Sequence, residues 1–117
     1  MRPLTDNCPK PLLEVSGKPL IEYHLHRLQK AGVERIVINI SWLGEQVRQR
    51  LRDGSGFGVE IVFSPEEQAL ETGGGIVKAL PYLGNDPFWV VNGDIWTDFS
   101  HHMVKLKQDA AIHLVMV

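Results

Sequence analysis

The sequence Leu70-Glu71-Thr72-Gly73-Gly74-Gly75-Ile76-Val77-Lys78 places three consecutive glycines between a predicted strand and a predicted helix. Glycine lets the backbone adopt positive φ and approach a ligand closely, and the N–H groups of a helix's first turn carry a partial positive charge that favours anions. Three glycines in a row also carry a backbone-entropy cost that a plain turn does not require. The segment therefore favours a phosphate or nucleotide site, with a tight turn that binds nothing as the alternative.

Two well-known glycine motifs do not match this segment. A Walker loop ends in adjacent Gly, Lys and Ser or Thr, whereas Ile76 and Val77 separate Gly75 from Lys78. A dinucleotide fingerprint that begins at Gly73 would need glycine in place of Lys78. The sequence thus excludes both the P-loop and the dinucleotide-cofactor interpretation.

Composition places the chain among ordinary globular proteins. Its 117 residues amount to one domain, 1–117, in which 44% of residues are hydrophobic and 22% are charged. The net charge of -2, with scattered basic residues, gives no indication of a nucleic-acid partner or an anionic membrane. No apolar run approaches the roughly 18 residues of a membrane span, and the first residues lack a signal-peptide core, so the expected location is the cytoplasm. The single cysteine, Cys8, excludes an internal disulfide and is expected in a loop.

Strand and helix patterns alternate along the chain. Apolar and β-branched runs predict strands, and apolar residues at helical spacing predict helices between them. The run at 35–40 is apolar nearly throughout, which is typical of a strand buried on both faces of a parallel sheet. The alternation predicts a three-layer α/β sandwich with a mostly parallel sheet. The expected strands are 35–40, 59–63, 87–91 and 110–117. The expected helices are 19–31, one marked by Leu43, Val47 and Leu51 that stops near Gly54, a brief one from Gly75 to Pro81, and one beginning near Asp98 or Ser100.

The N-terminal 18 residues are expected to form loop or extended backbone, because Pro3, Pro9, Pro11 and Gly17 interrupt them. Lys10 stands between two of these prolines, which fix φ on either side and stiffen the backbone that presents the lysine. This arrangement suits a positioned cation. A solvated loop lysine is the alternative.

A carboxylate follows the predicted strand at 87–91, in the sequence Asn92-Gly93-Asp94-Ile95-Trp96-Thr97-Asp98. Ligands of open parallel sheets bind outside the carboxyl ends of the strands, and Gly93 leaves Asp94 room beside a ligand. Magnesium takes one or two protein carboxylates together with phosphate oxygens, so Asp94 is a candidate Mg²⁺ ligand. An Asx-turn after a strand is the alternative.

The remaining polar clusters have structural interpretations. His24 and His26 are two residues apart and therefore point to different faces of a helix, which excludes a helical metal pair. The pair His101-His102 is expected at an exposed helix start. The arginines of the second helix, Arg48, Arg50 and Arg52, are expected to form a solvated face.

Several stretches together resemble the sugar-1-phosphate nucleotidylyltransferase family over the whole chain. They are Met1-Arg2-Pro3-Leu4-Thr5, Pro9-Lys10-Pro11-Leu12, Gly17-Lys18-Pro19-Leu20-Ile21, Leu70-Glu71-Thr72-Gly73-Gly74 and Asn92-Gly93-Asp94. Two details, Glu71-Thr72-Gly73-Gly74-Gly75 and Asn92-Gly93-Asp94-Ile95-Trp96-Thr97-Asp98, are most similar to members that use UTP and N-acetylmuramate 1-phosphate in peptidoglycan recycling. Many relatives read Leu-Gly-Thr-Ala-Gly where this chain has Leu70-Glu71-Thr72-Gly73-Gly74.

The resemblance implies a Rossmann-like fold of the GT-A type and an enzyme that joins a nucleoside triphosphate to a sugar 1-phosphate and releases pyrophosphate. It implies that Lys10 holds phosphate oxygens, that Glu71, Gly73 and Gly74 lie in the nucleotide site, and that Asp94 binds Mg²⁺. Asn92 is expected to touch the sugar. Lys10 and Asp94 are the expected catalytic residues.

Compared with the family pattern, the sequence lacks an opening strand with a G-x-G-x-R loop and the C-terminal half. The chain is therefore expected to be a partial catalytic domain, inactive alone, whose runs at 35–40 and 88–91 would expose apolar edges and self-associate. Two alternatives stay open. One is a mannose- or glucose-1-phosphate nucleotidylyltransferase, and the other is a non-catalytic nucleotide-binding module of the same fold.

Overall fold

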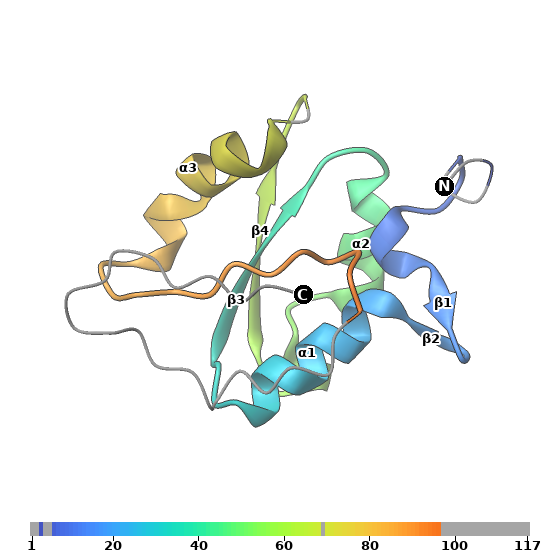
Figure 1. Ribbon diagram of the computed structural model, residues 1–117, viewed down its shortest axis with the longest axis horizontal. Coiled ribbons are helices and arrows are strands. Elements are labelled where there is room, and N and C mark those ends of the chain that lie inside the picture. The colour runs from blue at the N-terminus through green and yellow to red at the C-terminus, as the bar shows by residue number, and fades with distance from the viewer. Residues whose placement is uncertain (1–2, 4–5, 69, 97–117) are drawn as a thin grey trace.

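A computed structural model of the chain describes residues 3, 6–68 and 70–96. The predicted helix near 98–106, the predicted strand 110–117 and the His101-His102 pair lie outside the described residues. Figure 1 shows an α/β arrangement in which helices flank a small sheet. The elements in chain order are η1 (Lys10–Leu12), β1 (Glu14–Val15), β2 (Lys18–Pro19), α1 (Leu20–Lys30), β3 (Arg35–Ile40), α2 (Gly44–Leu51), η2 (Ser55–Phe57), β4 (Glu60–Pro65) and α3 (Glu71–Leu83).

The central sheet consists of β3 and β4, which pair in parallel from Arg35↔Glu60 to Ile40↔Pro65. The predicted parallel pairing is confirmed, and β3 has the predicted bounds. Alternate residues face opposite sides of a strand, so Ile36, Ile38 and Ile40 face one layer while Val37 and Asn39 face the other. In Figure 1, α1 and α2 lie on one side of this sheet and α3 lies on the other.

The hydrophobic core lies between the sheet and the pair α1 and α2. Apolar residues recur at helical spacing in both helices, and their buried side chains pack on the inward-facing residues of the strands. The buried members of this core are Ile21, Leu25, Ile40, Val47, Leu51, Val59 and Ile61. The predicted helix 19–31 is confirmed to within one residue at each end. The second helix begins at Gly44, next to the predicted Leu43, but ends at Leu51, before the predicted stop near Gly54.

Helix α3 differs from its prediction at both ends. The glycines are part of its first turns, because the helix begins at Glu71, and it continues through Pro81 to Leu83. Proline lacks an N–H and clashes with the preceding turn in a helix interior, but here only two residues follow it, so the lost hydrogen bond falls in the last turn. Glu71 itself has a φ of 59°, which reorients the chain as it enters the helix.

The predicted strand at 87–91 is wrong. These residues belong to a segment, 84–96, that runs from the end of α3 back across the molecule toward η1 (Figure 1), and they pair with no strand of the described chain. Phe88, Trp89 and Val90 are 41%, 40% and 53% exposed. Strand preference is realised through pairing and packing against neighbours, and the described residues offer this segment no ladder partner.

Strand β3 also has few packing neighbours, which lowers its burial. It is only partly buried, with Ile40 as its one fully buried residue, so the expectation of burial on both faces is wrong. The N-terminal segment is also more ordered than predicted, since residues 10–12 form a 3-10 turn and β1 pairs antiparallel with β2.

Candidate active site

Lys10 and Asp94 meet in the folded chain. The Lys10 ammonium donates a hydrogen bond to Asp94 Oδ2 over 2.7 Å, although 84 positions separate the two residues. Both side chains stay accessible, at 45% and 37% exposure. An exposed ion pair contributes little to stability. Its main effect is to place a cation and a carboxylate side by side where a ligand in solvent can contact both.

A short turn fixes the position of Lys10. The backbone N–H groups of Leu12 and Leu13 donate to the carbonyls of Pro9 and Lys10 over 2.9 and 3.1 Å. Pro9 is buried with a φ of −63°, so the turn begins from a rigid and anchored residue. The prediction that the prolines present Lys10 from a stiff backbone fits this geometry.

Asp94 lies in a turn with Gly93, within the segment 84–96. Gly93 lies against Pro11, since a Cβ on Gly93 would be 3.8 Å from Pro11 Cγ. The hydrogen bond from Lys10 lowers the pKa of the Asp94 carboxyl, and this effect outweighs the partial burial that would raise it. The carboxyl group is therefore ionised at neutral pH. Asn92 is exposed two positions before it.

The glycine segment, Gly73–Gly75, forms a second centre. Gly73 is exposed with open space where a Cβ would project, whereas Gly75 is buried against the sheet. A Cβ on Gly75 would lie 2.5 Å from Asn39 Nδ2 and 2.9 Å from Glu66 Oε1. Gly75 thus lets α3 approach the ends of β3 and β4, and Gly73 remains available to a ligand.

Two side-chain hydrogen bonds connect α3 and the residue before it to the end of β4. Glu66 Oε2 accepts a hydrogen bond from the backbone N–H of Leu70 at 3.2 Å, and Lys78 donates to the Pro65 carbonyl. The free N–H groups of the first turn of α3 lie beside the exposed Gly73. This end of the helix has the partial positive charge that suits a phosphate.

No hydrogen bond or ion pair of the described residues joins the Lys10–Asp94 pair to Glu71, Gly73 or Gly74. The structure therefore brings together two of the predicted site residues and places the glycines in a separate centre. Asn39 links the two, because it touches the Gly75 position and also lines a pocket that Lys10 borders.

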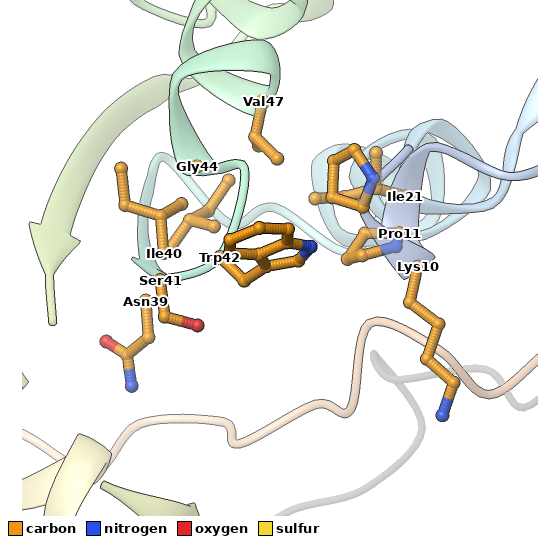
Figure 2. Close-up of a pocket in the computed structure, with 11 residues that line it drawn as sticks. Lys10, Pro11, Ile21, Asn39, Ile40, Ser41, Trp42, Gly44 and Val47 are labelled. Carbon is orange, nitrogen blue, oxygen red and sulfur yellow. The ribbon is translucent and has the colours of Figure 1, made fainter. Parts of the chain in front are cut away.

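This pocket, called the Trp42 pocket below, has a volume of about 350 Å³ at the C-terminal end of β3 (Figure 2). Sequence reasoning missed it. The signal was present, since Asn39-Ile40-Ser41-Trp42 ends an apolar strand in the same way as Asn92-Gly93-Asp94 follows one. The residues that line it are Pro9, Lys10, Pro11, Ile21, Ile38, Asn39, Ile40, Ser41, Trp42, Gly44 and Val47.

Metal ligands are sparse in the described part of the chain. No group of three or more His, Cys, Asp or Glu residues there could hold a metal ion. Likewise, none of the helices in the described ranges has both the length and the apolar character needed to cross a bilayer.

Comparison with known proteins defines the family. The model of the nucleotidyl transferase family matches residues 1–117. This chain belongs to that family. The resemblance expected from the sequence is therefore confirmed at the level of the family.

Three relatives illustrate the range of similarity. The chain is 62% identical over 101 residues to N-acetylmuramate alpha-1-phosphate uridylyltransferase of Neisseria meningitidis, a match that covers 86% of this chain and 44% of the relative. It is 48% identical over 104 residues to the protein of the same name from Caulobacter vibrioides, covering 86% and 43%. It is 38% identical over 95 residues to mannose-1-phosphate guanylyltransferase of Mycobacterium tuberculosis, covering 81% and 26%. The chain spans less than half the length of these relatives.

Proposed function

We propose that the protein joins a nucleoside triphosphate to a sugar 1-phosphate, giving a nucleotide-sugar and pyrophosphate. The observation that carries the proposal is the Lys10–Asp94 pair, formed at 2.7 Å in a chain of the nucleotidyl transferase family. In this reaction an oxygen of the sugar phosphate attacks the α-phosphorus, and the bond to the β-phosphate oxygen breaks as pyrophosphate leaves. Such chemistry depends on positioning and on neutralisation of negative charge.

Lys10 is the residue proposed to hold phosphate oxygens. Its ammonium is 45% exposed and is held on a short turn that begins at a buried proline. A phosphate oxygen could replace the Asp94 carboxylate as its partner, since both are anionic acceptors.

Asp94 is the proposed Mg²⁺ ligand. The residues fit this role, because the carboxyl group is ionised, is 37% exposed and uses only Oδ2 in the bond with Lys10. Mg²⁺ commonly binds through one or two carboxylates, with waters and substrate phosphates completing its shell, so Asp94 would supply one of its protein ligands. When bound, the ion would neutralise charge on the phosphates.

The start of α3 is proposed to face the nucleotide. Glu71, Gly73 and Gly74 lie in its first turns, and Gly73 has open space above its Cα. A bare glycine lets a planar base approach the backbone more closely than any side chain allows. Asn92, exposed beside Asp94, is proposed to contact the sugar.

UTP and N-acetylmuramate 1-phosphate are the proposed substrates, because the relatives at 62% and 48% identity carry that activity in their names. The corresponding context would be peptidoglycan recycling in the cytoplasm. The proposed architecture of the complete domain is a three-layer, Rossmann-like sandwich of the GT-A type. A mannose- or glucose-1-phosphate nucleotidylyltransferase is the second candidate, favoured by the 38% identity to a mannose-1-phosphate guanylyltransferase.

The test is pyrophosphate release by the complete natural protein, measured with UTP and N-acetylmuramate 1-phosphate and, in parallel, with GTP and mannose 1-phosphate. We expect faster turnover with the first pair and loss of turnover when Mg²⁺ is chelated. Better use of GTP with mannose 1-phosphate would overturn the substrate assignment. Binding of UTP without any pyrophosphate release would favour a non-catalytic nucleotide-binding module.

The role of Asp94 is tested by Asp94→Asn, which keeps the shape of the side chain and removes its charge. We expect turnover to be lost while the circular dichroism spectrum and the melting temperature stay close to those of the wild type, because the pair is exposed. A variant with an unchanged rate would remove Asp94 from the metal site.

A further inference from the structure

Asn39 presents an exposed amide at the C-terminal end of β3. An amide side chain offers both N–H donors and a carbonyl acceptor, yet within residues 3, 6–68 and 70–96 this one takes part in no hydrogen bond or ion pair. Ligands of open parallel sheets bind outside the carboxyl ends of the strands. Asn39 therefore has its polar groups available at the place where a ligand is expected.

The sheet face that carries Asn39 changes from apolar to polar at this end. Asn39 pairs with Ser64 of β4, whereas the preceding pair on the same face is Val37 with Val62. Ser64 is 1% exposed, and its Oγ has no hydrogen-bond partner in the described part of the chain. Polar side chains of a sheet are normally paired, so two adjacent polar residues at the strand ends indicate a polar group that approaches from outside.

Asn39 lies between the two centres of the candidate active site. On one side it lies under α3, since a Cβ on Gly75 would be 2.5 Å from Asn39 Nδ2. On the other side it lines the Trp42 pocket, which Lys10 also lines. Figure 1 shows α3 and the blue turn η1 on opposite sides of the end of β3, and Figure 2 shows Asn39 and Lys10 on opposite sides of Trp42. A ligand that extends from α3 to Lys10 would therefore pass over Asn39.

The order of groups in a nucleotide matches this order of residues. In a nucleoside triphosphate the ribose joins the base to the phosphates. The base is proposed to approach the exposed Gly73 on α3, and the phosphates are proposed to contact Lys10. The ribose would then lie over the end of β3, next to Asn39. Its hydroxyl groups both donate and accept hydrogen bonds, as the amide does.

We propose that Asn39 hydrogen-bonds the hydroxyl groups of the ribose and makes the site selective for ribonucleotides over deoxyribonucleotides. This inference rests on the proposed function and names Asn39 as a specificity-determining residue for it. A site that hydrogen-bonds a substrate hydroxyl rejects the analogue that lacks it, because the polar group of the protein is then covered without a partner.

The test compares UTP with dideoxyuridine triphosphate, which lacks both ribose hydroxyls, by calorimetric titration into the complete natural protein with Mg²⁺ and without sugar phosphate. We expect the wild type to bind the analogue about fivefold more weakly than UTP, as the loss of a neutral hydrogen bond implies. Asn39→Ala should raise the Kd for UTP about fivefold and leave the Kd for the analogue within about twofold. Asn85→Ala is the matched control, because Asn85 is also exposed but does not line the pocket, and it should leave both Kd values unchanged.

The ratio of the two Kd values separates a ribose contact from a structural role, which would weaken both ligands equally. Equal weakening by Asn39→Ala, or a wild type that does not distinguish the two ligands, would overturn the inference. Asn39→Thr is a second variant with a higher strand preference than alanine, and it should show the same loss of discrimination.

A separate assay of pyrophosphate release distinguishes this inference from the proposed function. Discrimination between the two nucleotides without pyrophosphate release would overturn the proposed reaction and leave the ribose contact in place. Pyrophosphate release without discrimination would overturn the role of Asn39 alone. Failure of the wild type to bind UTP would overturn both.

Discussion

At the scale of single residues, Lys10 lowers the pKa of Asp94. Its hydrogen bond lowers the pKa of the Asp94 carboxyl below the ordinary value of 3.8. Because the folded-state pKa lies below the unfolded one, the pair stabilises the fold above the unfolded pKa, and this contribution is lost as pH falls through the folded pKa. The group is a fixed negative charge throughout the physiological range.

We predict that Lys10→Ala raises the pKa of Asp94 toward its ordinary value, measured by the NMR titration of the Asp94 side-chain carbonyl carbon. Turnover should fall in parallel, because a charge-assisted contact to phosphate, worth about 1.5–3 kcal/mol, is lost. Lys18→Ala is the control, since Lys18 lies over the ring of Tyr23 at 5.0 Å and has no contact with Asp94. Equal behaviour of the two variants would contradict a special role for Lys10.

Gly73 has open space beside it, whereas Gly75 packs closely against the sheet. One alanine substitution at each position distinguishes a ligand-binding role from a packing role. Gly73→Ala meets no atom within 4 Å, so we predict that it stabilises α3 by about 0.5–1 kcal/mol and still raises the KM for the nucleotide, because the methyl group projects into the proposed site. Gly75→Ala places a methyl group 2.5 Å from Asn39 Nδ2 and 2.9 Å from Glu66 Oε1, so both side-chain ends must turn away, and we predict that it is less stable than Gly73→Ala.

Chemical denaturation and steady-state kinetics on the two variants provide the measurements. A Gly73→Ala protein that is more stable and has an unchanged nucleotide KM would show that Gly73 is an ordinary helix residue. A Gly75→Ala protein as stable as Gly73→Ala would contradict the tight approach of α3 to the sheet.

At the scale of elements, an ion pair joins α1 to α2. Arg50 Nε donates to Glu22 Oε1 over 2.8 Å, and the Glu22 side chain is only 11% exposed. Arg50 is 53% exposed, in keeping with the predicted solvated arginine face, but its guanidinium also pairs with Glu22. Arg48 lies over the ring of Phe63 at 5.2 Å. Periodicity locates these arginines on the outer side of a helix, but it gives no information about an acidic residue on the neighbouring helix.

We predict that Arg50→Ala lowers the free energy of unfolding by about 1–2 kcal/mol, because it leaves a nearly buried carboxylate without its partner while the arginine itself is half-exposed to solvent. Arg35→Ala is the matched control. Its pair with Glu60, at 3.0 Å, is 56% and 58% exposed and should contribute about 0–1 kcal/mol. Urea denaturation of both variants gives the comparison, and equal losses would contradict the role of burial.

At the scale of the whole molecule, the sheet of the described chain is small and its edges are open. β3 and β4 pair with each other, and no other described strand covers their outer edges. The neighbouring segment around Phe88 and Val90 exposes apolar side chains as well. Open edges and contiguous apolar surface promote association between chains.

We predict that the purified 117-residue chain self-associates and releases no measurable pyrophosphate. Sedimentation velocity should show a sedimentation coefficient that rises with concentration, and Val90→Lys, at a 53% exposed position, should shift the distribution toward the monomer. Val77→Lys, which changes a 67% exposed residue on α3 away from this segment, serves as the control. A monomeric and active 117-residue protein would contradict both parts of the prediction.

Local patterns in the sequence predict α1, α2 and the strands β3 and β4. The β-branched run at 35–40 and the apolar spacing in α1 and α2 require only neighbours within a few positions, so these elements could be predicted closely. The proline-flanked Lys10 and the carboxylate after an apolar run were also identifiable as site candidates, because backbone stiffness and strand ends are local properties.

Long-range contacts in the folded chain bring these residues and elements together. Lys10 and Asp94 are 84 positions apart, and nothing in either local pattern specifies the other as its partner. The same holds for Asn39 and Gly75, for Glu22 and Arg50, and for the Trp42 pocket, whose walls come from η1, α1, β3 and α2. The run at 87–91 shows the converse, since it has the composition of a strand but no partner within the described chain. A segment with strand composition forms a strand only when it pairs with a neighbour, and two charged residues form a site only when folding brings them together. Short-range periodicity does not encode these long-range contacts.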